Sequence, residues 1–175
     1  GNMISKSYLP ITSADTTQTL HDKLSQQGAD LMLQAMLELT KNGTLPSEPQ
    51  DESLVTYAHK LDKAEAAINW QSSAAEISRQ VRAFNPFPVA TAQFRGETCR
   101  IWFAIVSAHK THANAGEIVG LGANIHAACG DAVLNQDVIE RDVIEIVELQ
   151  MPGGKRQTAA QFIQGQHVKV GEVFS

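Results

Sequence analysis

The chain is poor in the features that mark secreted and membrane-bound proteins. It has two cysteines in 175 residues, too few for a disulfide framework, and both lie in apolar, strand-like runs where buried free thiols are common. Its longest uncharged stretch, residues 118–130, is shorter than the roughly 20 apolar residues that a membrane-spanning helix needs. The first residues show no basic segment followed by an apolar core. We therefore expect no secretory signal, no membrane attachment and a cytoplasmic location.

Complete active-site motifs are missing as well. Residues 152–155 (Pro-Gly-Gly-Lys) lack the first glycine of a phosphate-binding loop, and no Gly-x-Ser-x-Gly elbow occurs. The spacing of His109, His112, His126 and Cys129 resembles some zinc sites, but strand alternation directs the last two to opposite faces. We predict no catalytic residue, no metal site and no cofactor in this chain.

Helical periodicity dominates the first part of the chain. Leucines and methionines recur at helical spacing over residues 20–39, Asp15 is placed to cap this run, and Asn-Gly at 42–43 ends it. Because Gly28 interrupts the run, we predict a helical hairpin or one bent helix. Residues 44–70, with prolines and charged side chains, are predicted to form a linker.

The remaining residues, 71–175, combine one more helix with short strands. Ser73 and Glu76 form a capping box, and the Asn-Pro-Phe-Pro segment at 85–88 must end the helix. A tight turn at 95–97 joins the first two of five β-rich runs. Since no helical crossovers separate these runs, we predict an α+β fold in which an N-terminal helical segment precedes a small antiparallel, closed or nearly closed β-barrel. The predicted strands are 89–94, 100–107, 117–121, 125–129 and 143–149, and a terminal helix covers 158–164.

Charge is segregated along the chain, although its net value is only −5. Residues 78–116 carry five basic side chains and one acidic one, whereas residues 137–148 carry five acidic side chains and one basic one. A basic helix beside a β-barrel with basic turns is typical of modules that bind polyanions. An ordinary solvated face is the alternative, because surface arginines are common.

Three ordered motifs resemble a known family. They are residues 57–70, where Tyr-Ala-His-Lys-Leu-Asp-Lys leads to Ile-Asn-Trp; residues 82–88, Arg-Ala-Phe-Asn-Pro-Phe-Pro; and residues 149–156, Leu-Gln-Met-Pro-Gly-Gly-Lys-Arg. Together they resemble the carboxyl half of the methionyl-tRNA formyltransferases. Upstream, residues 1–16 resemble the end of that family's catalytic domain. The resemblance therefore covers nearly the whole chain.

The resemblance implies a role for each part. Members of the family transfer a formyl group from 10-formyltetrahydrofolate to the amine of the methionine on initiator tRNA, in translation initiation. Residues 1–43 would be the helical end of a Rossmann-like catalytic domain, 44–70 the linker and 71–175 an OB-like C-terminal domain that binds tRNA. The family's catalytic and folate-binding motifs precede the first residue here, so we expect this chain alone to be inactive. Its expected partners are the missing N-terminal catalytic domain and initiator methionyl-tRNA, and we favour a monomer.

Basic side chains are the predicted tRNA contacts, because duplex RNA is recognised through phosphates, 2′-hydroxyls and shape. Position in the family's motifs favours Lys60 and Lys63 in the linker, together with Arg82 in the Arg-Ala-Phe-Asn-Pro motif. Charge alone adds Arg79, Arg95, Arg100, Lys155 and Arg156.

Two further features carry structural predictions. We expect Trp70 and Phe87 to be core residues of the barrel rather than platforms for bases, since aromatic side chains bury much area. The segment between Leu134 and Ile144 is longer than the family pattern and supplies most of the acidic block. Because it would repel phosphate, we expect it to project away from the RNA surface or to bind something else.

Two other hypotheses stay open. Related C-terminal domains occur in formyltransferases that act on nucleotide sugars and in formyltetrahydrofolate dehydrogenase, which would change the substrate but not the fold. The second hypothesis is a non-catalytic assembly module that uses the acidic segment or exposed apolar helix faces as its contact surface.

Overall fold

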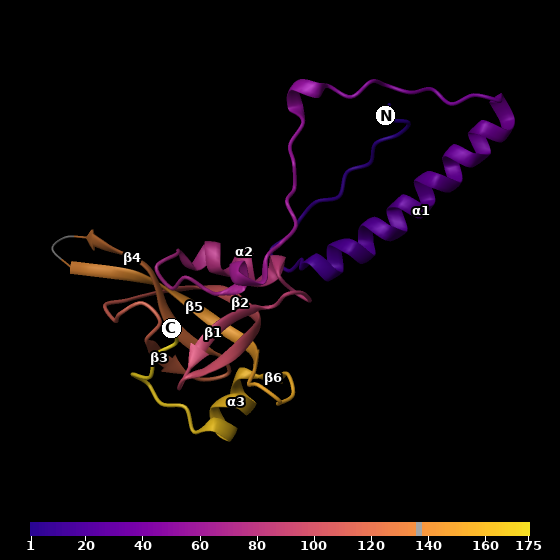
Figure 1. Ribbon diagram of the computed structural model, residues 1–175. Helices are drawn as coiled ribbons and strands as arrows, with labels where there is room; N and C mark the ends of the chain where they lie inside the picture. The colour runs from indigo at the N-terminus through magenta and orange to yellow at the C-terminus, as the bar shows by residue number, and fades with distance from the viewer. Residues whose placement is uncertain (136–137) are drawn as a thin grey trace. The chain divides into compact units, whose positions relative to one another are not determined.

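A computed structural model describes residues 1–135 and 138–175 of the chain (Figure 1). The described residues divide into two compact units, Gly1–Leu61 and Asp62–Ser175. Helices occur in both units and an antiparallel sheet in the second, which confirms the α+β fold. A search of the described part of the chain found no helix with the length and apolar character needed to cross a membrane.

The first unit is built around a single helix, α1 (Thr17–Asn42). Thr16 caps its first turn through reciprocal hydrogen bonds with Thr19, and Gly43 ends it in the left-handed conformation with a φ of 72°. Of the two predicted alternatives, the hairpin is wrong and a single helix is confirmed, because the helix continues through Gly28. A glycine costs about 1 kcal/mol relative to alanine in a helix, and the other residues of this long helix outweigh that cost.

Asp15, the predicted cap of this helix, has a different role. Its buried carboxylate accepts hydrogen bonds from the N–H and the hydroxyl of Thr12, both at 2.8 Å, and pairs with Lys23 Nζ. The Lys23 ammonium and the Thr12 donors hold the pKa of Asp15 well below its usual range. Asp15 thus ties the preceding segment to the helix. The rest of the unit is extended, apart from a 3₁₀ turn, η1 (Glu52–Leu54).

The second unit contains a sheet in the order β1-β2-β5-β4-β3, with β6 paired to β5. All five predicted strand runs are present, but β2, β4 and β5 are longer than the sequence pattern indicated. Within the described residues no ladder joins β1 to β3, so the sheet is open and the predicted barrel is not confirmed. The strands are β1 (Ala90–Phe94), β2 (Glu97–Thr111), β3 (Ile118–Leu121), β4 (Ile125–Asn135), β5 (Val138–Gln150) and β6 (Gln157–Thr158).

Helix α2 (Ala74–Ala83) packs on β2. The predicted capping box is confirmed, since Ser73 and Glu76 exchange side-chain to backbone hydrogen bonds at its first turn. Ser78 is buried on the inner face and donates its hydroxyl hydrogen to Ala104 O at 3.0 Å. The other helical elements of this unit are the 3₁₀ turn η2 (Lys63–Ala66) and the terminal helix α3 (Ala159–Gln166).

The predicted hairpin between the first two strands is confirmed. Arg95 and Gly96 have φ values of 51° and 81°, the left-handed pair that a two-residue hairpin turn requires. Phe94 and Glu97 face each other across this turn. The register places Thr91 opposite Arg100.

The carboxyl-terminal tail connects the two edges of the open sheet. Gln93 in β1 and Ser175 exchange two backbone hydrogen bonds, and Phe174 donates its N–H to Gly116 O just before β3. Gly116 has a φ of 86°, and a Cβ at this position would lie 2.0 Å from Phe174 O, so only glycine fits. The tail thus satisfies backbone groups that an open sheet would otherwise expose at its edges.

An aromatic cluster forms the centre of the core in this unit. Phe174 stacks on Trp70 with ring centroids 5.5 Å apart and lies 5.0 Å from Phe94, which in turn lies 5.7 Å from Phe162. The prediction of a core position is therefore confirmed for Trp70. It is wrong for Phe87, whose side chain is 64% exposed, because the prolines on either side hold this residue in a surface segment.

Both cysteines are free and buried, as the sequence predicted. Burial raises the pKa of the Cys99 thiol to about 11 and that of the Cys129 thiol to about 12. The two thiols therefore act as small core residues.

Strands β4 and β5 extend beyond the other strands at one end of the unit (Figure 1). Of the predicted acidic block, Asp137 lies outside the described residues. Lys110 Nζ pairs with Asp142, and Asn124 donates a hydrogen bond to Glu145 at 2.9 Å. The sheet itself therefore neutralises or solvates part of the acidic block.

We predict that the Arg95–Glu172 pair makes stability depend on pH. The Arg95 guanidinium donates to both Glu172 oxygens, at 2.7 and 2.9 Å, and holds the pKa of that carboxyl below its usual range. A depressed folded pKa gives stability that is present above the unfolded value of about 4.3 and is lost as pH falls through the folded value. Arg95→Ala should lower Tm at pH 7, and its difference from wild type should shrink below about pH 4.

Thermal unfolding between pH 3 and 7 measures this effect. Arg100→Ala is the control, since no ion pair of Arg100 occurs among the described residues. A Tm difference for Arg95→Ala that does not change with pH would contradict the assigned role of the pair.

We also predict opposite outcomes for two phenylalanines. Phe174→Ala should lower the free energy of unfolding by about 3–5 kcal/mol, because it empties the centre of the aromatic cluster. Phe87→Ala should change it by less than about 1 kcal/mol, because that ring is exposed. Urea unfolding measures both changes, and a large loss for Phe87→Ala would show that its ring is a core element.

Candidate nucleic-acid interface

A groove of about 420 Å³ lies within the second unit, beside the start of β2. Three segments build it: η2, the Pro-Phe-Pro segment between α2 and β1, and the outward face of the β1–β2 hairpin. It is lined by Lys63, Pro86, Phe87, Pro88, Val89, Thr91, Thr98, Arg100 and Trp102.

Lys63 is held at one side of the groove by local capping. Asp62 accepts a hydrogen bond from Ala64 N and donates its own N–H to the Glu65 carboxylate at 2.7 Å, which fixes the η2 turn. Ile68 N then donates to Thr91 O at 2.8 Å and attaches the end of this segment to β1. The lysine therefore projects from an ordered turn rather than from a free linker.

Trp102 forms part of the wall on the strand side. It lies at a shift of register between β2 and β5, where the ladder passes from Ile101 to Phe103. Its indole Nε1–H donates to Gln150 Oε1 at 2.9 Å, and its carbonyl accepts a hydrogen bond from Asn85 Nδ2 at the same distance. The Trp102 backbone is thus bonded to the segment that carries Phe87, while the Trp102 ring is held by Gln150.

Arg156 covers the tryptophan from the turn after β5. Its guanidinium carbon lies 4.9 Å from the centroid of the Trp102 ring, and the same group pairs with Glu148. Gln150 Nε2 donates to Gly154 O at 2.7 Å, which anchors the turn. The Gln150 amide therefore positions both the indole and the loop that carries Arg156.

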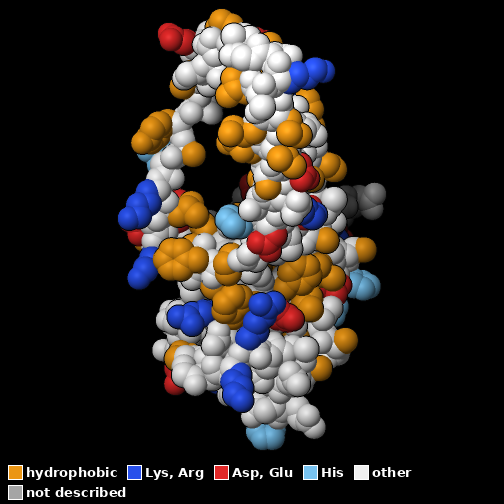
Figure 2. Space-filling view, turned by 90° about the vertical axis from the view of Figure 1, so that its right-hand side faces the viewer, with side chains coloured by type: hydrophobic (Ala, Val, Ile, Leu, Met, Phe, Trp, Pro, Cys, Tyr) orange, Lys and Arg blue, Asp and Glu red, His pale blue; other side chains and the backbone are white. Residues whose placement is uncertain are grey.

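The structure brings three of the predicted basic residues together around two aromatic rings. Lys63 and Arg100 line the groove with Phe87 and Trp102, and Arg156 lies over Trp102. In the lower part of Figure 2, Lys and Arg side chains lie among exposed hydrophobic ones. Lys155 is exposed in the turn next to Arg156.

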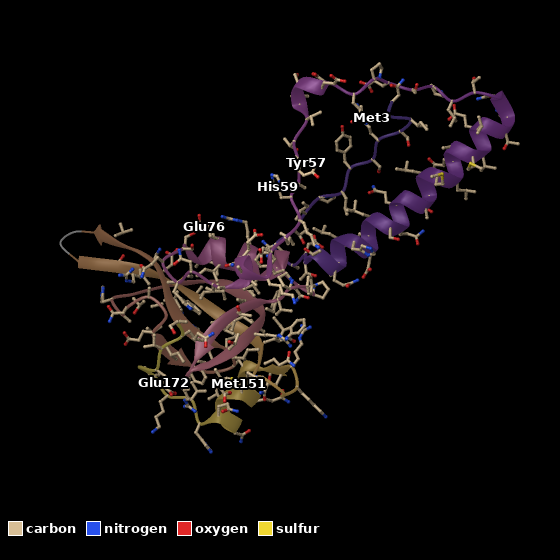
Figure 3. All side chains as sticks on the ribbon, in the orientation of Figure 1. Met3, Tyr57, His59, Glu76, Met151 and Glu172 are labelled. Atoms are coloured by element: carbon tan, nitrogen blue, oxygen red, sulfur yellow. The ribbon has the colours of Figure 1, made fainter. Side chains whose placement is uncertain are left out.

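Other predicted contacts lie elsewhere. Arg95 is occupied by Glu172 and by the carbonyl of Gln166, and Arg79 is exposed on α2 near Glu76. Figure 3 labels Glu172, the partner of Arg95, well apart from Glu76 in α2, the helix that carries Arg79. Arg82 is half-buried on α2, and Lys60 belongs to the first unit. The location of a side chain does not show whether it contacts tRNA. A contact with tRNA therefore stays a prediction for all eight basic residues.

Sequence reasoning missed the aromatic side of this surface. The sequence pattern predicts a core position for Phe87 and gives no role to Trp102. Strand alternation could have predicted the position of Trp102. It follows Arg100 by two residues in a strand, so the two side chains share a face. That face points outward if Arg100 is exposed.

A second groove, of about 380 Å³, lies beside β3 and contains two of the histidines considered for zinc. The rings of His109 and His126 are 6.3 Å apart, and His126 Nδ1 lies 4.0 Å from Glu145. The hydrogen bond from Asn124 is the main cause that lowers the pKa of Glu145. Across the described ranges, no group of three or more His, Cys, Asp or Glu is arranged to hold a metal ion.

Comparison with solved structures shows the same fold within a larger protein. The chain superposes on HypX from Aquifex aeolicus in complex with tetrahydrofolic acid with a TM-score of 0.66 and 15% identity, over 98% of this chain and 29% of that one. At this level of identity the likeness concerns the fold alone.

Sequence comparison is more specific. The chain is 52% identical over 174 residues to the methionyl-tRNA formyltransferase of Methylobacillus flagellatus and 42% identical over 175 residues to that of Dechloromonas aromatica. Each alignment covers 99% of this chain but only 53% and 52% of the relatives, so the chain spans about half their length. The profile of the formyl transferase C-terminal domain matches residues 60–167, which is more than half of the chain. The chain therefore belongs to the formyl transferase C-terminal domain family.

Proposed function

We propose that this chain is the tRNA-holding C-terminal part of a methionyl-tRNA formyltransferase. In this role it binds initiator methionyl-tRNA while the catalytic domain transfers a formyl group from 10-formyltetrahydrofolate to the methionyl amine. The observation that carries the proposal is the clustering of Lys63, Arg100 and Arg156 at one groove of an ordered sheet, in a chain whose relatives are named methionyl-tRNA formyltransferases.

The chemistry of the groove suits RNA. Phosphates are attracted by cations that are held close together, and a rigid scaffold lowers the entropic cost of binding. Two groove cations, Lys63 and Arg100, form no ion pair within the described part of the chain, so their charge is available to an outside anion. We propose that the open sheet with its bridging tail serves as an OB-like scaffold for this surface.

The catalytic domain is the proposed partner of α1. This helix has no buried residue, and five of its large apolar side chains are more than half exposed, Leu24 and a group of four closer to the C-terminal end. The four fall at positions separated by one, three or four residues, so they form a stripe along one side of the helix. An apolar stripe of this kind is normally covered by another element. The four side chains are Met32, Leu33, Met36 and Leu37, and the upper part of Figure 2 shows exposed hydrophobic groups along this helix.

Part of the acidic block lies away from the groove. The groove lies where β2 pairs with Gln150 of β5, whereas Glu140 lies near the other end of β5, which begins at Val138. Phosphates held at the groove would therefore be remote from Glu140, which limits repulsion.

We predict that binding of initiator tRNA to this chain weakens steeply with salt. Each phosphate contact releases counterions and contributes roughly 0.7 to 0.9 to the slope of log affinity against log salt concentration. Filter binding or fluorescence anisotropy between 50 and 300 mM salt measures this slope. Weak binding that does not respond to salt would contradict the proposal. Binding of nucleotide sugars but not of tRNA would instead support the alternative hypothesis, a formyltransferase that acts on nucleotide sugars.

We further predict that charge reversal in the groove weakens binding more than the same change elsewhere. Arg100→Glu should lower the affinity for tRNA about tenfold or more and reduce the salt slope, because it removes a charge-assisted contact and adds a repulsive charge. Lys63→Glu together with Lys60→Glu should weaken binding to all RNA sequences alike.

Lys169→Glu is the matched control, since it makes the same charge change at an exposed residue of the second unit that is not a predicted tRNA contact. An equal loss of affinity for Lys169→Glu would show that the net charge of the domain, and not the groove, determines binding.

A further inference from the structure

We infer that the groove holds one unpaired nucleotide of the bound RNA, with its base against the Phe87 ring and its phosphates at Lys63 and Arg100. This inference rests on the proposed function and adds the nature of the recognised RNA element. It assigns a binding role to two aromatic residues, Phe87 and Trp102, that phosphate attraction alone does not explain.

The exposure of Phe87 is the first observation. Its ring is 64% exposed although the surrounding segment is well anchored: Val89 N donates to Phe84 O at 2.9 Å, and Asn85 Nδ2 donates to Trp102 O. A phenylalanine in a surface loop of this length usually turns inward, because burying the ring gains about 2 kcal/mol. Here the flanking prolines and the Asn85 contact fix the segment, so the ring remains outward as a flat apolar surface beside the groove.

The second observation is the composition of the groove. Its lining combines two aromatic rings, two cations and the hydroxyls of Thr91 and Thr98. Aromatic faces accept any base by stacking, cations bind the phosphates on either side, and threonine hydroxyls bond to sugar or base edges. The volume of about 420 Å³ falls at the small end of ligand sites, which suits a single nucleotide rather than a helix.

The third observation is the fixed position of Trp102 in the groove wall. The indole of Trp102 is fixed by Gln150 on one side and covered by Arg156 at 4.9 Å on the other. An aromatic ring whose position is already fixed loses little side-chain entropy on binding. A base inside a duplex is stacked on its neighbours and cannot reach such a ring, so the occupant must be an unpaired nucleotide.

Substitution of the Phe87 ring tests this inference in the complete chain. Phe87→Leu keeps an apolar side chain but removes the flat π face, and Phe87→Tyr keeps the face. We expect Phe87→Leu to weaken binding of initiator tRNA about 5- to 150-fold, the range that loss of one stacked base produces. Because no charge changes, the salt slope should stay that of the wild-type chain. Phe87→Tyr should restore most of the affinity.

A matched control and a second probe separate the possible outcomes. Tyr8→Leu removes an aromatic residue that is more exposed than Phe87, at 89%, from the first unit and should leave the affinity unchanged. A blunt RNA duplex without unpaired nucleotides should bind wild type and Phe87→Leu with equal affinity.

Two results would overturn the inference while leaving the proposed function intact. One is a Phe87→Leu chain that binds tRNA as tightly as wild type while Arg100→Glu weakens binding. The other is an equal loss on tRNA and on the blunt duplex. If the wild-type chain binds no tRNA at low salt, the proposed function fails and the inference fails with it.

Discussion

The pleat of β2 is the constraint on which both the core and the groove depend. Successive side chains of a strand point to opposite faces, so Cys99 and Ile101 enter the core while Arg100 and Trp102 face the groove. A shift of the register by one residue would bury a guanidinium and expose an isoleucine. The free-energy cost of burying that charge would unfold the domain. The hydrogen bond from Trp102 to Gln150 adds a second restraint on the same register.

Local charge, rather than net charge, distinguishes this surface. The basic stretch at residues 78–116 owes part of its excess to Arg95 and Lys110, and the fold pairs both with carboxylates. Counting charges along the sequence cannot separate such internal pairs from cations directed at a ligand. Lys63 and Arg100 could be proposed from motif position and charge, but the fact that they share a groove with Phe87 depends on the tertiary structure.

Sequence patterns predicted the features that neighbouring residues decide. The Ser73–Glu76 capping box, the hairpin turn after β1 and the strand alternation all depend on contacts within a few residues. The incorrect and missing predictions depend on contacts beyond the local pattern. The tail at 172–175 has no pattern of its own and takes its extended form from the two sheet edges. Phe87 is exposed because the flanking prolines and the hydrogen bond from Asn85 to Trp102 O in β2 together hold its segment at the surface.

The two tryptophans of the chain allow one direct test of the proposed interface. Trp102 lines the groove, whereas Trp70 is buried against Phe174, so their indole N–H groups report on the groove and on the core separately. In a TROSY spectrum of the chain titrated with initiator tRNA, the account predicts that the Trp102 indole resonance shifts or broadens while that of Trp70 stays in place. Formation of the complex with an unchanged Trp102 resonance, or with changes centred on His109 and His126, would contradict it.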